Sequence, residues 1–98
     1  MHRSPSAETV ELCMAAIRAY APARHVPAPP LEAWETADHG AREIYIDDSA
    51  KVRGAEGTVY WTFVVTIDAD GNIVKTAHFR SKIGQGGRRD TLPPEGPE

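Results

Sequence analysis

Five side chains in the second half of the chain have the chemistry of a phosphate-binding or proton-transferring site. A histidine exchanges protons near neutral pH, and an arginine holds a phosphate through two parallel hydrogen bonds. A lysine adds positive charge, and a tyrosine ring can stack on a base. A metal-free ribonuclease needs such parts, a proton shuttle and groups that stabilise the pentacovalent phosphate. These candidates are Tyr60, Thr62, His78, Arg80 and Lys82.

The same residue types also occur on ordinary solvent-exposed sheet faces. There, Tyr60 and Arg80 would form only a cross-strand cation–π pair. All five side chains are therefore candidate binding residues. In the alternative interpretation, His78, Arg80 and Tyr60 are catalytic.

A long β-hairpin over residues 58–82 is the element that would position these side chains. Residues 58–68 alternate between large apolar side chains and β-branched or amphipathic ones, and a strand points successive side chains to opposite faces. One face of this strand is therefore predicted to lie in the core. Its residues are Val59, Trp61, Phe63, Val65 and Ile67.

The turn of the hairpin decides which residues lie opposite one another. A three-residue loop, with a type I turn and then Gly71 in the left-handed region, places Asp68 opposite Asn72. The expected pairs are then Trp61–Phe79 on the core face and Thr62–His78, Tyr60–Arg80 and Thr58–Lys82 on the other face.

A two-residue turn at Asp70-Gly71 is the alternative. It would turn His78 and Arg80 to the core face and Phe79 to solvent. Because the buried face determines the register, we favour the three-residue loop.

The first half of the chain is predicted to supply helices and a further strand. Ser4 and Pro5 are typical of a helix start, and Val10, Cys13, Met14 and Ile17 recur at helical spacing until Pro22. Residues 21–30 hold four prolines and indicate an extended connector. We expect a short helix over 31–39 carrying Trp34 and capped by Gly40, a strand over 42–47, and a short edge strand over 50–53.

Composition indicates one small globular domain, with 98 residues, 41% of them apolar and 26% charged. We expect the domain over residues 1–83 and a disordered Gly/Pro-rich tail over 84–98. The only cysteine, Cys13, excludes an internal disulfide, and there is no signal peptide or apolar run of membrane-spanning length, so we expect a cytoplasmic protein. The histidines and Cys13 lack metal-ligand spacing, so we expect no metal and no cofactor.

Charge is distributed unevenly along the chain, although the net charge is only −3. Residues 31–72 contain nine acidic side chains and three basic ones, whereas residues 73–89 contain five basic side chains and no acidic one. The favoured account of this asymmetry is that the basic strand pairs with acidic neighbours and a flexible tail. The net acidity favours a protein partner, and the basic 73–89 segment is the candidate contact for nucleic acid. A sheet edge is the candidate contact for a homodimer.

Together these features predict an α+β domain, in which one or two N-terminal helices pack on a three- to four-stranded antiparallel sheet dominated by the long hairpin. The layout is broadly similar to that of small bacterial toxin nucleases, although such toxins are usually basic and no motif is shared. We expect a small non-catalytic binding or accessory module that engages a protein partner through its sheet face or acidic region. The alternative is a metal-free RNA-binding or RNA-cleaving, toxin-like domain that uses the face of His78 and Arg80.

Overall fold

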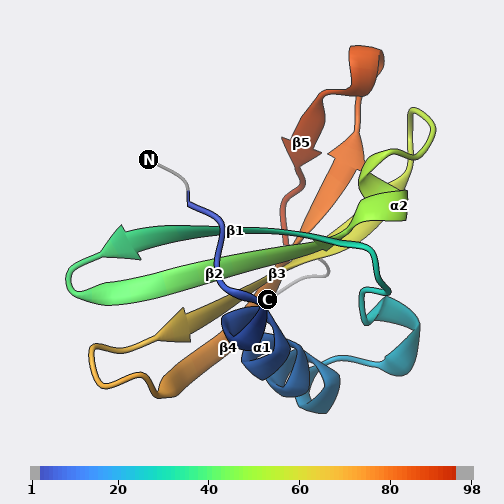
Figure 1. Ribbon diagram of the computed structural model, residues 1–98. Helices are drawn as coiled ribbons and strands as arrows, with labels where there is room; N and C mark the ends of the chain where they lie inside the picture. The colour runs from blue at the N-terminus through green and yellow to red at the C-terminus, as the bar shows by residue number, and fades with distance from the viewer. Residues whose placement is uncertain (1–2, 95–98) are drawn as a thin grey trace.

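One helix packs against a five-stranded antiparallel sheet whose strands follow in sequence order, β1-β2-β3-β4-β5 (Figure 1). The predicted α+β class is confirmed, with five strands instead of three to four. The structure is a computed structural model, and it describes residues 3–94. Its elements are α1 (Ala7–Tyr20), a 3₁₀ turn (Ala23–His25), β1 (Leu31–Asp38), β2 (Ala41–Asp48), α2 (Ser49–Val52), β3 (Val59–Ile67), β4 (Ile73–Ile83), a second 3₁₀ turn (Gln85–Gly87) and β5 (Arg89–Thr91).

Helix α1 begins at Ser6 and not at Ser4. The hydroxyl of Ser6 accepts a hydrogen bond from the backbone N–H of Thr9 at 3.1 Å and so satisfies one of the helix's unpaired donors. Glu8 lies in the first turn, where the positive end of the helix dipole favours a carboxylate. Pro22 follows the C-terminal cap residue and prevents the helix from continuing.

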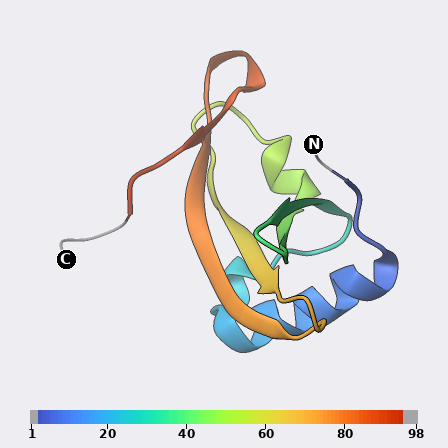
Figure 2. The ribbon, with the colours of Figure 1, turned by 90° about the vertical axis from the view of Figure 1, so that its left-hand side faces the viewer.

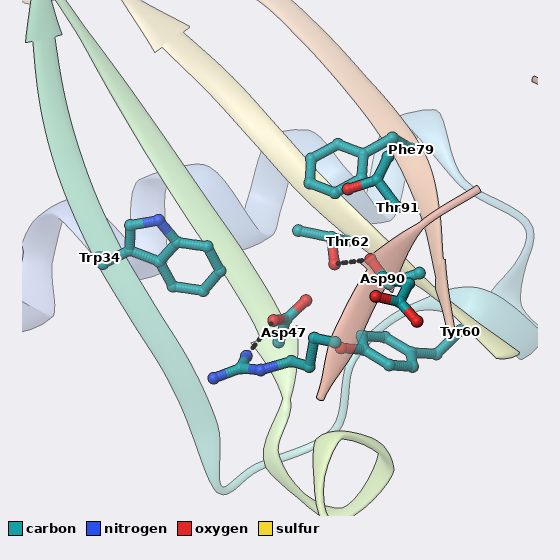
Figure 3. A pocket seen from close by; sticks show the side chains of 9 residues that line it. Trp34, Asp47, Tyr60, Thr62, Phe79, Asp90 and Thr91 are labelled. Atoms are coloured by element: carbon teal, nitrogen blue, oxygen red, sulfur yellow. Dashed lines mark hydrogen bonds and ion pairs between the residues drawn. The ribbon is translucent and has the colours of Figure 1, made fainter. Parts of the chain in front are cut away.

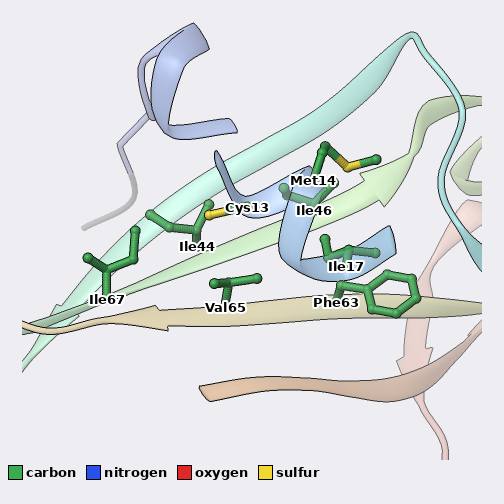
Figure 4. Packing of buried hydrophobic residues seen from close by; sticks show 8 residues of the cluster. All are labelled: Cys13, Met14, Ile17, Ile44, Ile46, Phe63, Val65 and Ile67. Atoms are coloured by element: carbon green, nitrogen blue, oxygen red, sulfur yellow. The ribbon is translucent and has the colours of Figure 1, made fainter. Parts of the chain in front are cut away.

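The core lies between α1 and one face of the sheet, here called the helix face (Figure 4). Three α1 side chains pack there onto strands β2 and β3, and the two strands meet with Ile44 opposite Val65 and Ile46 opposite Phe63. The predicted apolar stripe is confirmed in its inner part, while Val59 at its end is 49% exposed. The buried cluster is Cys13, Met14, Ile17, Ile44, Ile46, Phe63, Val65 and Ile67.

Residues 31–38 form strand β1, so the short helix predicted over 31–39 is wrong. The residues on either side of the turn pair as Asp38–Ala41, and the two turn residues His39 and Gly40 have φ angles of 50° and 82°. Positive φ at both central residues is what a type I′ hairpin turn requires. Gly40 thus serves a hairpin and not a helix cap, and Trp34 lies on the sheet face away from α1.

Residues 49–52 form the short helix α2, so the edge strand predicted over 50–53 is also wrong. The Asp48 carboxylate caps this helix by accepting a hydrogen bond from the backbone N–H of Ala50 at 3.0 Å. Its other oxygen accepts one from the N–H of Ala28 at 3.0 Å. One aspartate therefore fixes both α2 and the proline-rich connector.

The β3–β4 hairpin follows the predicted register only at its turn. Gly71 has φ 86°, the Asp68 N–H donates to the Asn72 carbonyl, and Ile67 pairs with Ile73, as expected for the three-residue loop. A bulge follows, because Thr66 pairs with Lys75 and leaves Val74 as an extra residue on β4.

The bulge turns every later β4 residue to the other face. Phe63 lies opposite His78, Trp61 opposite Arg80, and Thr62 opposite Phe79. The predicted pairs beyond the turn, from Trp61–Phe79 to Thr58–Lys82, are therefore wrong. His78 and Arg80 share the helix face, and Phe79 lies on the opposite face.

The sheet curls strongly, as the bowed β3 and β4 in Figure 2 show. Residues 89–91, within the segment predicted to be a disordered tail, form β5 and pair with residues 81–83 of β4. Residues 95–98 of that tail lie outside the described residues. Arg89 on β5 reaches Glu32 on β1 at 3.6 Å and Asp47 on β2 at 3.2 Å, so the first and last strands approach each other in space.

Candidate functional site

The five side chains predicted to form one site are divided between the two faces of the sheet. Tyr60 and Thr62 lie buried on the face away from α1, here called the open face. His78, Arg80 and Lys82 lie on the helix face, because the bulge shifts β4 by one residue. Tyr60 therefore lies on the face opposite to that of His78, although Tyr60 and Arg80 both line one smaller cavity.

His78 lies in a stack of rings at the margin of the core. Its ring stacks on Trp61 with 3.7 Å between the ring centroids, and His25 stacks on the same indole at 3.9 Å. The Nδ1 atom of His78 is 2.7 Å from the hydroxyl of Tyr20. Two imidazoles thus cover the two faces of Trp61, which leaves its edge as the part available to a base.

A pocket of about 360 Å³ opens on the open face (Figure 3). Strands β1 to β5 all contribute to its walls, so the curl of the sheet is what encloses it. We call it the Asp47 pocket. Its lining residues are Trp34, Asp47, Tyr60, Thr62, Phe79, Ser81, Arg89, Asp90 and Thr91.

Strand alternation places the polar residues in this pocket. On β2, Ile44 and Ile46 point to α1, so Asp47 points to the open face. On β3, Tyr60 and Thr62 follow the same rule opposite Ser81 and Phe79 of β4. The Thr62 and Ser81 hydroxyls are 3.1 Å apart and hydrogen-bond to each other.

Asp47 is the electrostatic centre of the pocket. Its side chain is only 1% exposed, and its Oδ2 accepts a hydrogen bond from a terminal nitrogen of Arg89 at 3.2 Å. Burial raises the pKa of Asp47 above its ordinary value, against the opposing effects of the nearby Thr62 hydroxyl and the Arg89 guanidinium. The pocket therefore holds a desolvated carboxylate that Arg89 only partly compensates.

Two buried polar atoms in the pocket have no hydrogen bond of good geometry within residues 3–94, namely Asp47 Oδ1 and Tyr60 Oη. Burial and the proximity of Asp47 also raise the pKa of Tyr60, so its hydroxyl keeps its proton at neutral pH. An unsatisfied buried polar group costs about 1–3 kcal/mol. A bound group that hydrogen-bonds to both atoms would recover this cost, which makes the pocket a binding site in chemical terms.

The rim of the Asp47 pocket is charged, and three of its nine lining side chains are aromatic. Glu32 lies 3.6 Å from Arg89 and 4.0 Å from Arg53, and Arg88 pairs with Asp90 at 3.0 Å. The ring of Trp34, which lines the pocket, stacks on that of Tyr45 behind it, with centroids 5.2 Å apart. An aromatic centre within a polar rim is the anatomy of a protein-interface hot spot.

A second cavity, of about 310 Å³, has the opposite electrostatic character. Its lining includes Arg24, Lys51 and Arg80 together with His25, and within the described part of the chain no acidic side chain lines it. We call it the basic cavity. It borders Trp61 and is chemically suited to an anion such as a phosphate.

Metal-binding and membrane-spanning features were sought in the same residues. Between residues 3 and 94, no three His, Cys, Asp or Glu side chains are grouped so as to hold a metal ion. In that range no helix is long and apolar enough to cross a membrane. Cys13 lies fully buried in the core, and burial raises the pKa of its thiol to about 11, so it stays protonated at neutral pH.

Of the pocket residues, Tyr60 and Thr62 are predicted from the sequence as site residues, whereas Asp47, Arg89 and Trp34 are not. Asp47 precedes Asp48-Ser49 and was therefore assigned to the end of a strand before a polar turn. A usable signal was present, because Glu43, Tyr45 and Asp47 alternate with Ile44 and Ile46. That alternation places Asp47 on the same sheet face as Tyr60. Arg89 carried no such signal, because its segment was predicted to be disordered.

Comparisons with known proteins identify no relative. No protein-family model matches the chain, and no curated protein or solved structure shows significant similarity to it.

Proposed function

We propose that this chain is a small non-catalytic binding module that engages a protein partner through the open face of its sheet. The observation that carries the proposal is the Asp47 pocket, in which Asp47 Oδ1 and Tyr60 Oη are buried without hydrogen bonds in the described chain. A single side chain of a partner would fill the pocket, while the charged rim of Glu32, Arg53 and Arg89 would contact the surrounding surface. Because Cys13 is buried and alone, the cytoplasm is the proposed compartment.

A protein partner fits the rim better than a free small molecule does. The three ion pairs that surround the pocket lie on exposed or half-exposed side chains from β1, the segment after α2, and the β5 region. Such pairs contribute little to the stability of the chain itself. In an interface they would determine the orientation of a partner and its association rate.

The test is a selection of binding peptides, carried out in parallel on the wild-type chain and on two variants. Thr91→Trp places an indole at the mouth of the pocket, where Thr91 is exposed. Ala15→Trp adds the same side chain to an exposed position on α1 and is the matched control. We expect a peptide consensus that binds the wild-type chain and Ala15→Trp equally, and that binds Thr91→Trp at least about tenfold more weakly, a loss of 1.4 kcal/mol.

Amide NMR then locates the bound peptide. The proposal predicts shifts concentrated on β2, β3 and β4 residues around the pocket. Equal binding to all three proteins, or shifts on α1 alone, would contradict it. A wild-type chain that yields no consensus would contradict it as well.

RNA binding is a second candidate function, and the basic cavity is the observation that favours it. Three cationic side chains, Arg24, Lys51 and Arg80, line this cavity without an acid from the described residues. Phosphate groups of a single strand would fit there, with the edge of Trp61 against a base. A cleaving version would use His78, whose neighbour is Tyr20 and not Tyr60.

Titration with short single-stranded RNA at low and near-physiological salt tests this second function. Shifts around residues 24, 51 and 80 that survive the higher salt, and that Lys51→Ala weakens more than Lys75→Ala, would support it. Lys75 is an exposed lysine outside the basic cavity and is the matched control. Shifts that both variants weaken equally and that salt abolishes would show nonspecific charge attraction.

A further inference from the structure

The chemistry of the Asp47 pocket specifies the group that it binds. Asp47 Oδ1 is a carboxylate oxygen and accepts hydrogen bonds, whereas Tyr60 Oη can donate one. Figure 3 shows the carboxylate of Asp47 and the hydroxyl end of Tyr60 in the same part of the pocket. A hydroxyl group on the ligand is the smallest group that serves both, because it donates to Asp47 and accepts from Tyr60.

A cationic group is less well matched to this position. The Arg89 guanidinium already holds Asp47 Oδ2 at 3.2 Å, so its charge compensates part of the carboxylate charge. A second cation beside it would be repelled by Arg89. A neutral hydroxyl meets the one oxygen that Arg89 leaves open and carries no charge into the buried site.

The walls of the pocket select the body of the ligand. Trp34 lies on one side of the pocket and Phe79 on another in Figure 3. The ring of Trp34 is held by Tyr45, which stacks on it at an interplanar angle of 4°. Tyr45 in turn meets Phe79 edge to face at 6.4 Å. A further aromatic ring extends this arrangement, because aromatic rings attract one another in edge-to-face geometry.

We infer that the Asp47 pocket binds a phenol, and that the phenol is a tyrosine side chain of the protein partner. This inference rests on the proposed function for the source of the phenol, but not for the chemistry of the pocket. The phenol hydroxyl donates to Asp47 Oδ1 and accepts from Tyr60 Oη, and its ring lies against Trp34 and Phe79.

Three small probes of nearly equal shape test the chemistry of the pocket. Amide NMR titrations of the full chain with p-cresol, 4-methylanisole and toluene compare a phenol, its methyl ether and the bare ring. We expect p-cresol to bind at least about tenfold more tightly than 4-methylanisole, because the ether cannot donate to Asp47 and leaves its Oδ1 atom without a donor. The shifts should map to strands around residues 47, 60 and 81.

Two variants connect the preference to the named atoms. Tyr60→Phe removes only a hydroxyl that has no hydrogen bond of good geometry in the described chain, so we expect it to fold. It should weaken p-cresol several-fold and leave toluene unchanged. Thr66→Val removes a hydroxyl on the same strand and face but outside the pocket, and is the matched control. Equal affinities for the three probes would overturn the inference. So would tighter binding of a fourth probe, 3-methylindole, which has the ring system of a tryptophan side chain.

Binding of p-cresol and of the selected peptides together separates this inference from the proposed function. A peptide that binds the open face equally well after its tyrosine is replaced by phenylalanine would overturn the inference and leave the proposed function standing. Binding of p-cresol in the pocket, together with no peptide consensus, would refute the protein partner and retain the phenol chemistry. A tyrosine-dependent peptide consensus displaced by p-cresol supports both.

Discussion

At the scale of single residues, two buried carboxylates show how the groups around a carboxylate determine the free-energy cost of burying its charge. Glu35 on β1 faces the helix side of the sheet and holds the Arg42 guanidinium through two hydrogen bonds of 2.8 and 2.9 Å. Asp47 on β2 faces the opposite side and accepts a single hydrogen bond of 3.2 Å from Arg89 at its Oδ2 atom. The Arg42 hydrogen bonds lower the pKa of Glu35, whereas burial raises the pKa of Asp47. The contributions of the two acids to the free energy of unfolding therefore change with pH in opposite directions.

We expect Glu35→Gln to lower the free energy of unfolding at neutral pH by about 1–2 kcal/mol. The value lies in the lower part of the range for charged hydrogen bonds, because the Arg42 side chain is 40% exposed to water. Because the folded-state pKa of Glu35 is lowered, its contribution is present above the ordinary pKa of 4.5 and is lost as the pH falls through the folded pKa. Denaturant titrations at neutral and acidic pH measure both values. A difference that stays constant with pH would contradict the role of the ion pair.

Asp47→Asn should show the opposite trend. The raised pKa means that the folded chain takes up the Asp47 proton at a higher pH than the unfolded chain does, so the ionised carboxylate costs stability at neutral pH. This cost is relieved as the pH falls from the folded-state pKa to the ordinary value of 3.8. The stability of the variant relative to the wild type should therefore be more favourable at neutral pH than near the ordinary pKa. The same titrations measure it, and a trend parallel to that of Glu35→Gln would contradict it.

At the scale of elements, the β4 bulge is what separates the predicted site from the observed one. The extra residue, Val74, is 59% exposed, and the pairs from Thr66–Lys75 onward follow one uninterrupted register. Packing beyond the bulge therefore decides which β4 side chains face the core. The extra residue in the bulge allows this register to coexist with the geometry of the turn.

Deleting Val74 should convert the bulge into a regular ladder and leave His78 opposite Phe63. We expect a change in the free energy of unfolding below about 1 kcal/mol, because an exposed side chain is lost and no pair is broken. Nuclear Overhauser contacts between Tyr20 and His78 report the register. Deleting Ala77, within the regular part of β4, is the matched control and should disrupt these contacts. Their loss in the Val74 deletion would show that the bulge itself sets the register.

The sequence predicted those elements whose pattern agrees with their packing. Residues 59–67 and 42–47 alternate clearly, and α1 has a helical stripe with a serine cap, so each was identified. Residues 31–38 were misassigned because Leu, Ala and Glu favour helices in isolation, whereas pairing with β2 decides their structure here. The misassignment of residues 31–38 hid Trp34 as a pocket residue. The β4 bulge and the pairing of residues 89–91 depend on contacts distant in sequence, and that pairing is what hid Arg89.

At the scale of the whole molecule, Arg89 joins the two ends of the sheet. It lies on β5, the last strand, and contacts Glu32 on β1 and Asp47 on β2. These contacts bring the two sheet edges together around the Asp47 pocket. β5 itself pairs with only three residues of β4. Its position therefore depends strongly on this one side chain.

Arg89→Ala should increase amide hydrogen exchange on β5 and on residues 81–83 by roughly tenfold, because opening this segment then breaks fewer contacts. Arg88→Ala is the matched control, since Arg88 lies just before β5 and pairs with Asp90 of that strand, and none of the described ion pairs joins it to β1 or β2. We expect the Arg88→Ala chain to exchange at nearly the wild-type rate. Equal acceleration in both variants would show that the Arg89 contacts do not hold the strand.

Because strands that are neighbours in the sheet are also neighbours in sequence, the sheet can be pulled apart strand by strand from its edges. Force applied between residues 31 and 91 would load the Arg89 contacts first, because they alone among the described ion pairs connect β5 with β1 and β2. Once they part, each strand can peel from its neighbour one hydrogen bond at a time, because every strand pairs with the one beside it in sequence. A group seated in the pocket touches walls from all five strands and would resist the first step of this peeling. Binding in the pocket would therefore raise the force at which the strands begin to separate.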